Sequence, residues 1–143
     1  MTHEDAGKYR AKHPPGTALR PGLAQALETV ARDGRVTCAA AHKIAAAAGV
    51  LPTEVGKAID LMEYRITTCQ MGLFGYPEKK RVKPVDPVPG PLKDALLAAS
   101  SDNRISCAAC WKIADALKIA RMEVAGACET LGVRIKPCQL GAF

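Results

Sequence analysis

The chain has 143 residues, a formal net charge of +6 and only 4% aromatic residues. So few aromatic side chains exclude a base-stacking platform for single-stranded nucleic acid. No apolar run reaches the roughly 18 residues of a membrane span, and the N-terminal stretch lacks the apolar core of a signal peptide. We therefore expect a soluble, cytoplasmic protein without a membrane partner.

The chain contains two copies of one sequence. Leu23–Phe74 aligns without a gap on Leu92–Phe143, and 21 of the 52 aligned pairs are identical. Such self-similarity at a fixed offset indicates a duplicated structural unit. It divides the chain into a basic arm (1–22), repeat 1 (23–74), a proline-rich basic linker (75–91) and repeat 2 (92–143). Copies of this size are marginal as independent domains, so we expect them to pack together about a pseudo-two-fold axis.

The first half of each repeat predicts a helix followed by a short strand. Leu23–Arg32 has apolar residues at helical spacing, and so does Leu92–Ser101. Asp-Gly follows the first of these segments and Asp-Asn the second, and both dipeptides are turn signals. A short extended piece comes next, which is Arg35–Thr37 in repeat 1.

The second half of each repeat predicts two helices and a strand. Thr37 and its equivalent Ser106 are good N-caps for the Ala-rich helix that follows. Gly49 ends this helix in repeat 1, and a third helix occupies Thr53–Glu63. The β-branched run within Arg65–Cys69 then predicts a strand.

The predicted order is helix, strand, helix, turn, helix, strand, which is the order of a winged helix-turn-helix unit with a reduced wing. Ala45, Gly49 and Val55 fit the small, turn and apolar positions of the helix-turn-helix pattern. Lys118 replaces the glycine in repeat 2, so the second match is weaker. We expect a mainly α protein with short β-strands (α+β), built from two tandem winged-helix-like repeats.

The chain resembles tandem winged-helix proteins, and its last residues, CQLGAF, look like the CQLGxFG ending of small proteins from anaerobic bacteria and archaea. The winged-helix class implies binding to double-stranded DNA, with the third helix of each unit as the reader. By that resemblance the readers are Thr53–Glu63 and Met122–Leu131. The first has Lys57 as its only cation, and the second has none, with Arg121 at its entrance.

The two readers therefore offer few of the side chains that usually contact DNA. The arm and the linker each hold four Lys or Arg against two Asp or Glu, and we expect the phosphate contacts to come from them. A solvated run of charge is the alternative interpretation of the linker. The candidate DNA-binding residues are Thr53, Lys57, Arg121, Lys79, Lys80, Arg81 and Lys83.

Cysteines form a second kind of candidate site. Cys38 and Cys107 follow equivalent N-caps, and Cys69 and Cys138 end equivalent strands. The first and last strands of a unit would pair, which would bring the two cysteines of each unit together. Two such pairs could converge as ligands of zinc or of an iron–sulfur cluster, or each pair could act as a redox dithiol.

Burial is the alternative for all six cysteines, because a free Cys commonly packs as a small hydrophobe. It is our preferred interpretation for Cys128, which aligns with Ile59 of repeat 1. Cys110 completes a CxxC motif that repeat 1 lacks. The candidate metal or redox residues are Cys38, Cys69, Cys107, Cys110 and Cys138.

Phe74 and Phe143 are equivalent and are the only phenylalanines in the chain. We expect each to fill the same hydrophobic slot in its own unit. Gly72 and Gly141 would permit the bend that precedes each ring.

No set of residues argues for catalysis, because the sequence lacks a phosphate-binding glycine loop, a Ser/His/Asp set and a His-carboxylate metal motif. We therefore expect a protein that is not an enzyme. The first hypothesis is a DNA-binding transcriptional regulator that responds to thiol chemistry or to a metal. The alternatives are a protein-interaction module, with a protein partner or a second copy, and a thiolate carrier of a metal or an iron–sulfur cluster.

Overall fold

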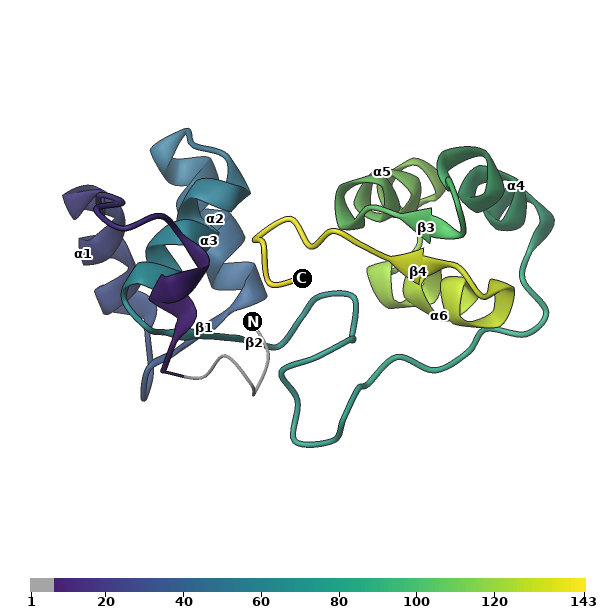
Figure 1. The fold of residues 1–143 in the computed structure, drawn as a ribbon. Coiled ribbons are helices and arrows are strands. Elements are labelled where there is room, and N and C mark those ends of the chain that lie inside the picture. The colour runs from purple at the N-terminus through teal and green to yellow at the C-terminus, as the bar shows by residue number, and fades with distance from the viewer. Residues whose placement is uncertain (1–6) are drawn as a thin grey trace. The chain divides into compact units, whose positions relative to one another are not determined.

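The computed structural model describes residues 7–143 as two compact units (Figure 1). Unit 1 contains the chain up to Cys69 together with Leu140–Ala142, and unit 2 contains Gln70–Gln139 together with Phe143. Residues 1–6 of the basic arm lie outside the described part. Residues 70–74, which close repeat 1, thus belong to unit 2, whereas Leu140–Ala142 of repeat 2 belong to unit 1.

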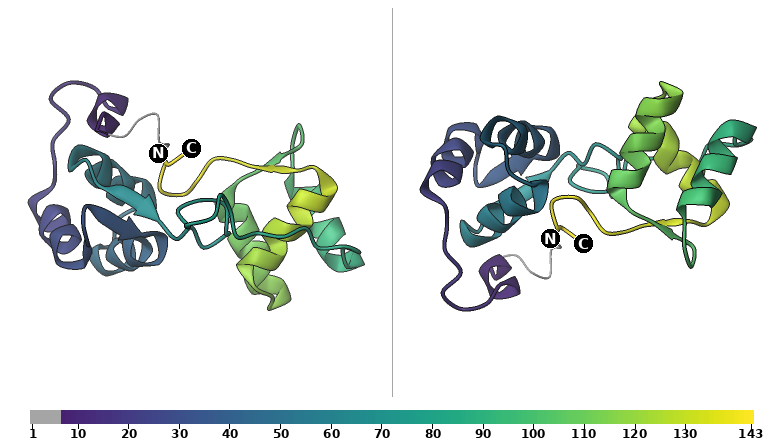
Figure 2. Two further views of the ribbon diagram at one scale, coloured as in Figure 1. Left: turned by 90° about the horizontal axis from the view of Figure 1, so that it is seen from below. Right: turned by 90° about the horizontal axis from the view of Figure 1, so that it is seen from above.

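Unit 1 is a cluster of three helices with one pair of strands (Figures 1 and 2). Its elements are the 3₁₀ turn η2 (Tyr9–Lys12), α1 (Pro21–Val30), β1 (Arg35–Thr37), α2 (Cys38–Ala48), α3 (Pro52–Leu61) and β2 (Arg65–Thr67). Pro21 and Pro52 lie in first turns, where a missing N–H costs nothing. The hydroxyl of Thr37 accepts a hydrogen bond from the Ala40 N–H at 3.1 Å, which confirms the predicted N-cap.

Unit 2 has the same order of elements. They are α4 (Gly90–Ala99), β3 (Arg104–Ile105), α5 (Cys107–Leu117), α6 (Arg121–Leu131) and β4 (Arg134–Ile135). The hydroxyl of Ser106 caps α5 by accepting from the Ala109 N–H at 3.1 Å, as Thr37 caps α2. The predicted mainly helical α+β fold class is confirmed.

The turn between the second and third helices has the same backbone in both units. Gly49 ends α2 in the left-handed region with φ of 67°. Lys118 ends α5 in the same region with φ of 56°. The lysine thus adopts a conformation that is easy for glycine and strained for other residues.

The two strands of each unit pair in parallel. Arg35 lies opposite Arg65 between β1 and β2, and Arg104 lies opposite Arg134 between β3 and β4. Parallel strands require a crossover connection rather than a hairpin, and the second and third helices form that crossover. The pairing of first and last strands is as expected, but each described sheet has two parallel strands and contains no antiparallel wing hairpin.

The third helix of unit 1 is covered on its outer side by extended chain. The arm packs on α3 through η2, where Tyr9 is buried. A Cβ at Gly56 would overlap the Leu140 carbonyl group and would lie 2.7 Å from its carbon atom. Glycine at this position therefore permits the C-terminal segment to cross the helix.

The third helix of unit 2 is covered in a similar way by the linker. The Val85 N–H donates to the Gly126 carbonyl at 3.1 Å, and the Thr130 hydroxyl donates to the Val85 carbonyl at 2.6 Å. A Cβ at Gly126 would overlap the Lys83 carbonyl oxygen. Within α6, Val124–Cys128 is an unbroken run of buried residues.

The two phenylalanines contact each other. Their rings meet edge to face with centroids 5.7 Å apart, and both residues belong to unit 2. Phe143 is 37% exposed and Phe74 is half-buried. The prediction that each ring fills a slot in its own unit was wrong, because the closing segment of repeat 1 belongs to unit 2.

Candidate nucleic-acid interface

The candidate DNA contacts on α3 are only partly available. Thr53 is exposed at the start of the helix. Lys57 is half-buried, and its ammonium forms an ion pair with Glu54 at 3.2 Å. Because the arm and Leu140 cover the outer side of α3, the helix presents its N-terminal end rather than a full face.

Arg121, at the start of α6, is held by two neighbours in unit 2. Its guanidinium lies 3.5 Å from the ring centroid of Trp111, in cation–π geometry, and it donates a hydrogen bond to the side-chain oxygen of Gln70. Gln70 is the first residue of the segment 70–74 that closes repeat 1. The structure therefore gives Arg121 a packing role, and its contact with DNA stays a prediction.

Two of the four candidate linker cations are engaged in surface ion pairs. Lys80 pairs with Glu129 at 2.9 Å, while Arg81 pairs with Glu78 at 3.1 Å and stacks on Tyr76. Hydrogen bonds from the backbone and from Arg81 lower the pKa of Glu78. Such exposed pairs are weak because water screens them, so a phosphate group can replace them.

Lys79 and Lys83 are also exposed. No ion pair engages either lysine among the residues that the structure describes. The linker therefore stays a candidate for phosphate contact.

The arm is fastened to α3 by a buried carboxylate. Asp60 is 2% exposed and accepts a hydrogen bond from His13 at 2.7 Å, with Lys12 at 3.3 Å. Its second oxygen has no hydrogen-bond partner among the described residues. Lys12 and His13 are thus committed to α3 and are poor candidates for phosphate contact.

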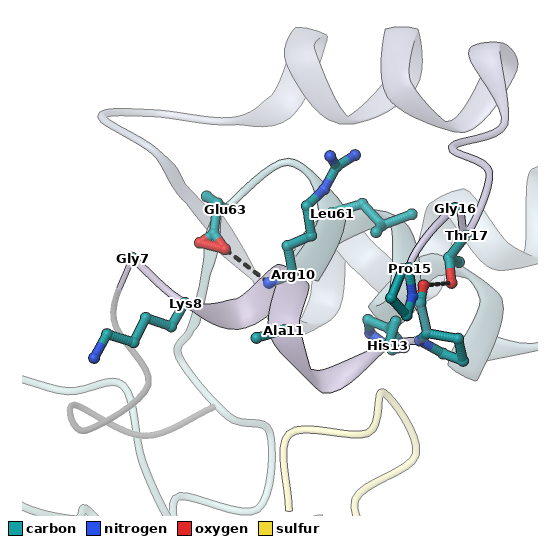
Figure 3. Close-up of a pocket in the computed structure, with 11 residues that line it drawn as sticks. Gly7, Lys8, Arg10, Ala11, His13, Pro15, Gly16, Thr17, Leu61 and Glu63 are labelled. Carbon is teal, nitrogen blue, oxygen red and sulfur yellow. Dashed lines mark hydrogen bonds between the residues drawn. The ribbon is translucent and has the colours of Figure 1, made fainter.

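A hollow of about 820 Å³ lies between the arm and the end of α3 (Figure 3). Lys8, Arg10, His13 and Glu63 are among the residues that line it. The two carboxylate oxygens of Glu63 accept from the backbone N–H groups of Tyr9 and Arg10, at 3.1 and 2.7 Å. Glu63 therefore anchors the arm, and the residues that line the hollow include the two cations Lys8 and Arg10.

The sequence interpretation missed the exposed faces of the two strand pairs. In unit 1, Arg35 and Arg65 lie opposite each other, with Thr37 opposite Thr67 on the same side. The intervening Val36 and Ile66 are buried, whereas Arg35 and Thr37 are exposed and Arg65 and Thr67 are half-buried, so this side of the strand pair faces away from the core. The signal was present in the alignment, because both arginines recur at the equivalent positions of repeat 2.

Unit 2 repeats this arrangement. Arg104 lies opposite Arg134, and the Lys136 N–H donates to the Ile105 carbonyl at 2.8 Å, which continues the register past β4. Lys136 is exposed next to the partly exposed Ser106. Each unit therefore presents a small outer face of arginines flanked by hydroxyls or a lysine.

All six cysteines are buried, and none forms a disulfide in the described part of the chain. Among the described residues, no group of three or more His, Cys, Asp or Glu side chains is arranged to hold a metal ion. Zinc or iron–sulfur binding by Cys38, Cys69, Cys107, Cys110 and Cys138 therefore stays a prediction. Anaerobic purification followed by metal analysis and a visible spectrum tests it.

A buried thiol pair in unit 2 was also missed. Cys110 on α5 and Cys128 on α6 form a hydrogen bond, and both are at most 1% exposed. This hydrogen bond and burial raise the pKa of the Cys110 thiol. Repeat 1 has Ala41 and Ile59 at these positions, so only one copy carries the signal.

Cys107 contacts the segment that follows β4, on either side of its predicted partner Cys138; Cys138 itself lies beyond the strand, which ends at Ile135 rather than at the cysteine as predicted. Its backbone N–H donates to the Pro137 carbonyl at 3.1 Å, and the Gln139 amide donates to its sulfur at 3.5 Å. Gln139 thus satisfies a buried sulfur.

Comparison with protein-family models, with curated proteins and with solved structures found no match to this chain. No helix in the described part is long and apolar enough to cross a membrane. The function must therefore be argued from the residues themselves.

Proposed function

We propose that the protein binds double-stranded DNA as a non-enzymatic regulator of transcription, built from two winged-helix-like units related by a pseudo-two-fold axis. One observation carries this proposal. In both units the turn between the second and third helices contains a residue in the left-handed backbone conformation, which is Gly49 in unit 1 and Lys118 in unit 2. A duplicated helix-turn-helix in a chain of net charge +6 is typical of duplex binding.

The covered third helices restrict how such a protein would meet DNA. The N-terminal ends of α3 and α6 stay accessible, with Thr53 exposed and Arg121 half-buried. A helix N-terminus favours phosphate because its first N–H groups are unsatisfied and its dipole is positive there. We therefore propose that backbone contacts dominate over base reading.

A titration of a fluorescently labelled mixed-sequence duplex tests this function. Binding measured by anisotropy at 50 and 200 mM salt should weaken steeply with salt, because neutralised phosphates release counterions. Nonspecific dissociation constants are roughly 10⁻⁴–10⁻⁶ M at physiological salt and are lower at low salt. Absence of binding at 50 mM salt and tens of micromolar protein would reject the proposal.

A protein-interaction module is the second candidate, and the covering of α3 and α6 favours it. Leu51 of unit 1 is 69% exposed, and Leu97 and Phe143 of unit 2 are 51% and 37% exposed, so each unit has at least one large apolar side chain at its surface. Sedimentation of the purified protein over a hundredfold concentration range separates the candidates. Self-association without duplex binding would favour the second.

A further inference from the structure

We infer that the outer face of each strand pair is a binding site for the phosphate backbone of double-stranded DNA; this inference rests on the proposed function and deepens it. The faces are defined by Arg35 and Arg65 in unit 1, and by Arg104 and Arg134 in unit 2. They are called the arginine faces below.

The register of the strands makes these arginines unusual. Neighbouring strands lie about 4.8 Å apart, and like charges placed directly opposite each other destabilise a sheet. Both units nevertheless place arginine opposite arginine at the same position. Arg35, Arg104 and Arg134 are exposed, and the recurrence of the arginine pairing in both copies points to a ligand outside the fold.

Alternation along the strands directs these side chains outward. Val36 and Ile66, which follow the arginines of unit 1, are each 1% exposed. Ile105 and Ile135 are the buried partners in unit 2. Because successive strand residues point to opposite sides, the arginines lie on the outer side of both strand pairs.

The neighbours of the arginines are suited to an anion. Thr37 and Thr67 follow on the same face of unit 1, and Lys136 lies beside the arginine face of unit 2. Within the described chain, no acidic side chain forms an ion pair with Arg35 or Arg104. The faces therefore combine positive charge with hydroxyl and ammonium donors.

Guanidinium groups bind phosphate oxygens through two parallel N–H donors, which gives both strength and fixed geometry. The faces are open strands, whereas a small phosphorylated metabolite is usually enclosed in a pocket. Two equivalent open faces on one chain suit a ligand that repeats its phosphates. Double-stranded DNA has that periodic backbone, and phosphate contacts of this kind fix position without reading sequence.

The test uses the full chain with three arginines neutralised, R35Q/R104Q/R134Q. We expect the slope of log affinity against log salt to fall by about 0.9 for each phosphate contact that is lost. The matched control is K43Q/K93Q/K112Q, which removes three exposed lysines from α2, α4 and α5. Because it removes the same charge elsewhere, it should leave most of the slope in place.

Thermal unfolding separates this binding role from a structural one. Removing arginine from the like-charged pairs relieves repulsion, so the triple variant should unfold at the same temperature as the wild type or higher. A second variant, R35K/R104K/R134K, keeps the charge but loses the two-donor geometry. Its affinity for the duplex should lie between that of the wild type and that of the triple glutamine variant. A large loss of thermal stability in the glutamine variant would overturn the inference.

A second experiment, a titration with inorganic phosphate, distinguishes the inference from the proposed function. Arginine side-chain N–H signals of the wild type, followed by NMR during addition of phosphate, should shift for the arginine faces. Such shifts without any duplex binding would overturn the proposed function and, with it, the assignment of double-stranded DNA as the ligand of the arginine faces. Duplex binding with an unchanged salt slope in the triple glutamine variant, or with unshifted arginine signals, would overturn the inference and leave the proposed function in place.

Discussion

In both units a segment of chain crosses the third helix in close contact with a glycine, but the crossing lies at a different position of the helix in each unit. In unit 1 the C-terminal segment crosses α3 at Gly56, and in unit 2 the linker crosses α6 at Gly126. These glycines are not equivalent, because Gly56 aligns with Ala125 and Gly126 aligns with Lys57. Each unit thus requires a close backbone approach, but the location of the approach depends on which segment covers the helix.

The buried acid of unit 1 shows the same divergence. Asp60 is buried and holds the arm, whereas its equivalent Glu129 is exposed and pairs with Lys80. By contrast, the N-caps, the left-handed turns, the parallel strand pairs and the outward arginines are common to both units. The shared features define the unit, and the two copies differ in the segment that covers the third helix.

Substitution of the crossing glycines should have the largest effect. Gly56→Ala and Gly126→Ala each force a methyl group into a backbone carbonyl, and we expect the free energy of unfolding to fall by about 2–3 kcal/mol. Urea denaturation measures the change. The control is Gly22→Ala in α1, where a Cβ meets nothing within 4 Å, and it should be neutral or slightly stabilising.

Removal of the buried acid comes next. Asp60→Ala leaves His13 and Lys12 without their carboxylate, and we expect a loss of about 2 kcal/mol in unfolding free energy. Glu129→Ala, at the exposed equivalent position, should cost at most about 0.5 kcal/mol. Equal losses in the two variants would show that the arm is not held through Asp60.

The buried Cys110–Cys128 pair of unit 2 can be replaced by the residues that occupy the equivalent positions of unit 1. Cys110→Ala alone should cost about 1 kcal/mol, because it leaves a small void at a buried site. Cys128→Ile alone should overpack the same site by a similar amount. The double variant reproduces the Ala41 and Ile59 pair of unit 1, so a double-mutant cycle should recover most of both losses. Strict additivity would refute this complementarity.

The turn residue should give the smallest effect. Lys118→Gly removes the backbone strain of a left-handed residue that carries a side chain, but glycine also gives the unfolded chain more freedom. Because the second effect offsets part of the first, we expect the free energy of unfolding to rise by only about 0.5 kcal/mol. The reverse change in the other unit, Gly49→Lys, should cost about 1 kcal/mol. Thermal melts of the two variants should shift in opposite directions.

Local features of the fold were predictable from the sequence. Helical spacing located all six helices to within about two residues, and the hydroxyl residues before α2 and α5 are caps as expected. The strand Arg35–Thr37 was predicted with its observed bounds. These features depend on neighbours in the chain, which is why short-range patterns reveal them.

Long-range features were not predictable in the same way. A short strand has no pattern that reports whether its partner runs parallel, and nothing in the closing phrase of repeat 1 indicates that it belongs to unit 2. Because residues 70–74 belong to unit 2, the ring of Phe74 contacts the ring of Phe143. Asp60 was missed for a related reason, because its burial depends on an arm some 47 residues earlier in the chain.

The most direct test of the account is the salt dependence of duplex binding in variants that disable one unit at a time. We expect R35Q and R104Q each to lower the slope by about 0.9 and the combined variant to lower it by about 1.8, because each unit contacts phosphate through an equivalent face. Unchanged slopes in both single variants, together with a lower slope in K79Q, would contradict the account and assign the phosphate contacts to the linker.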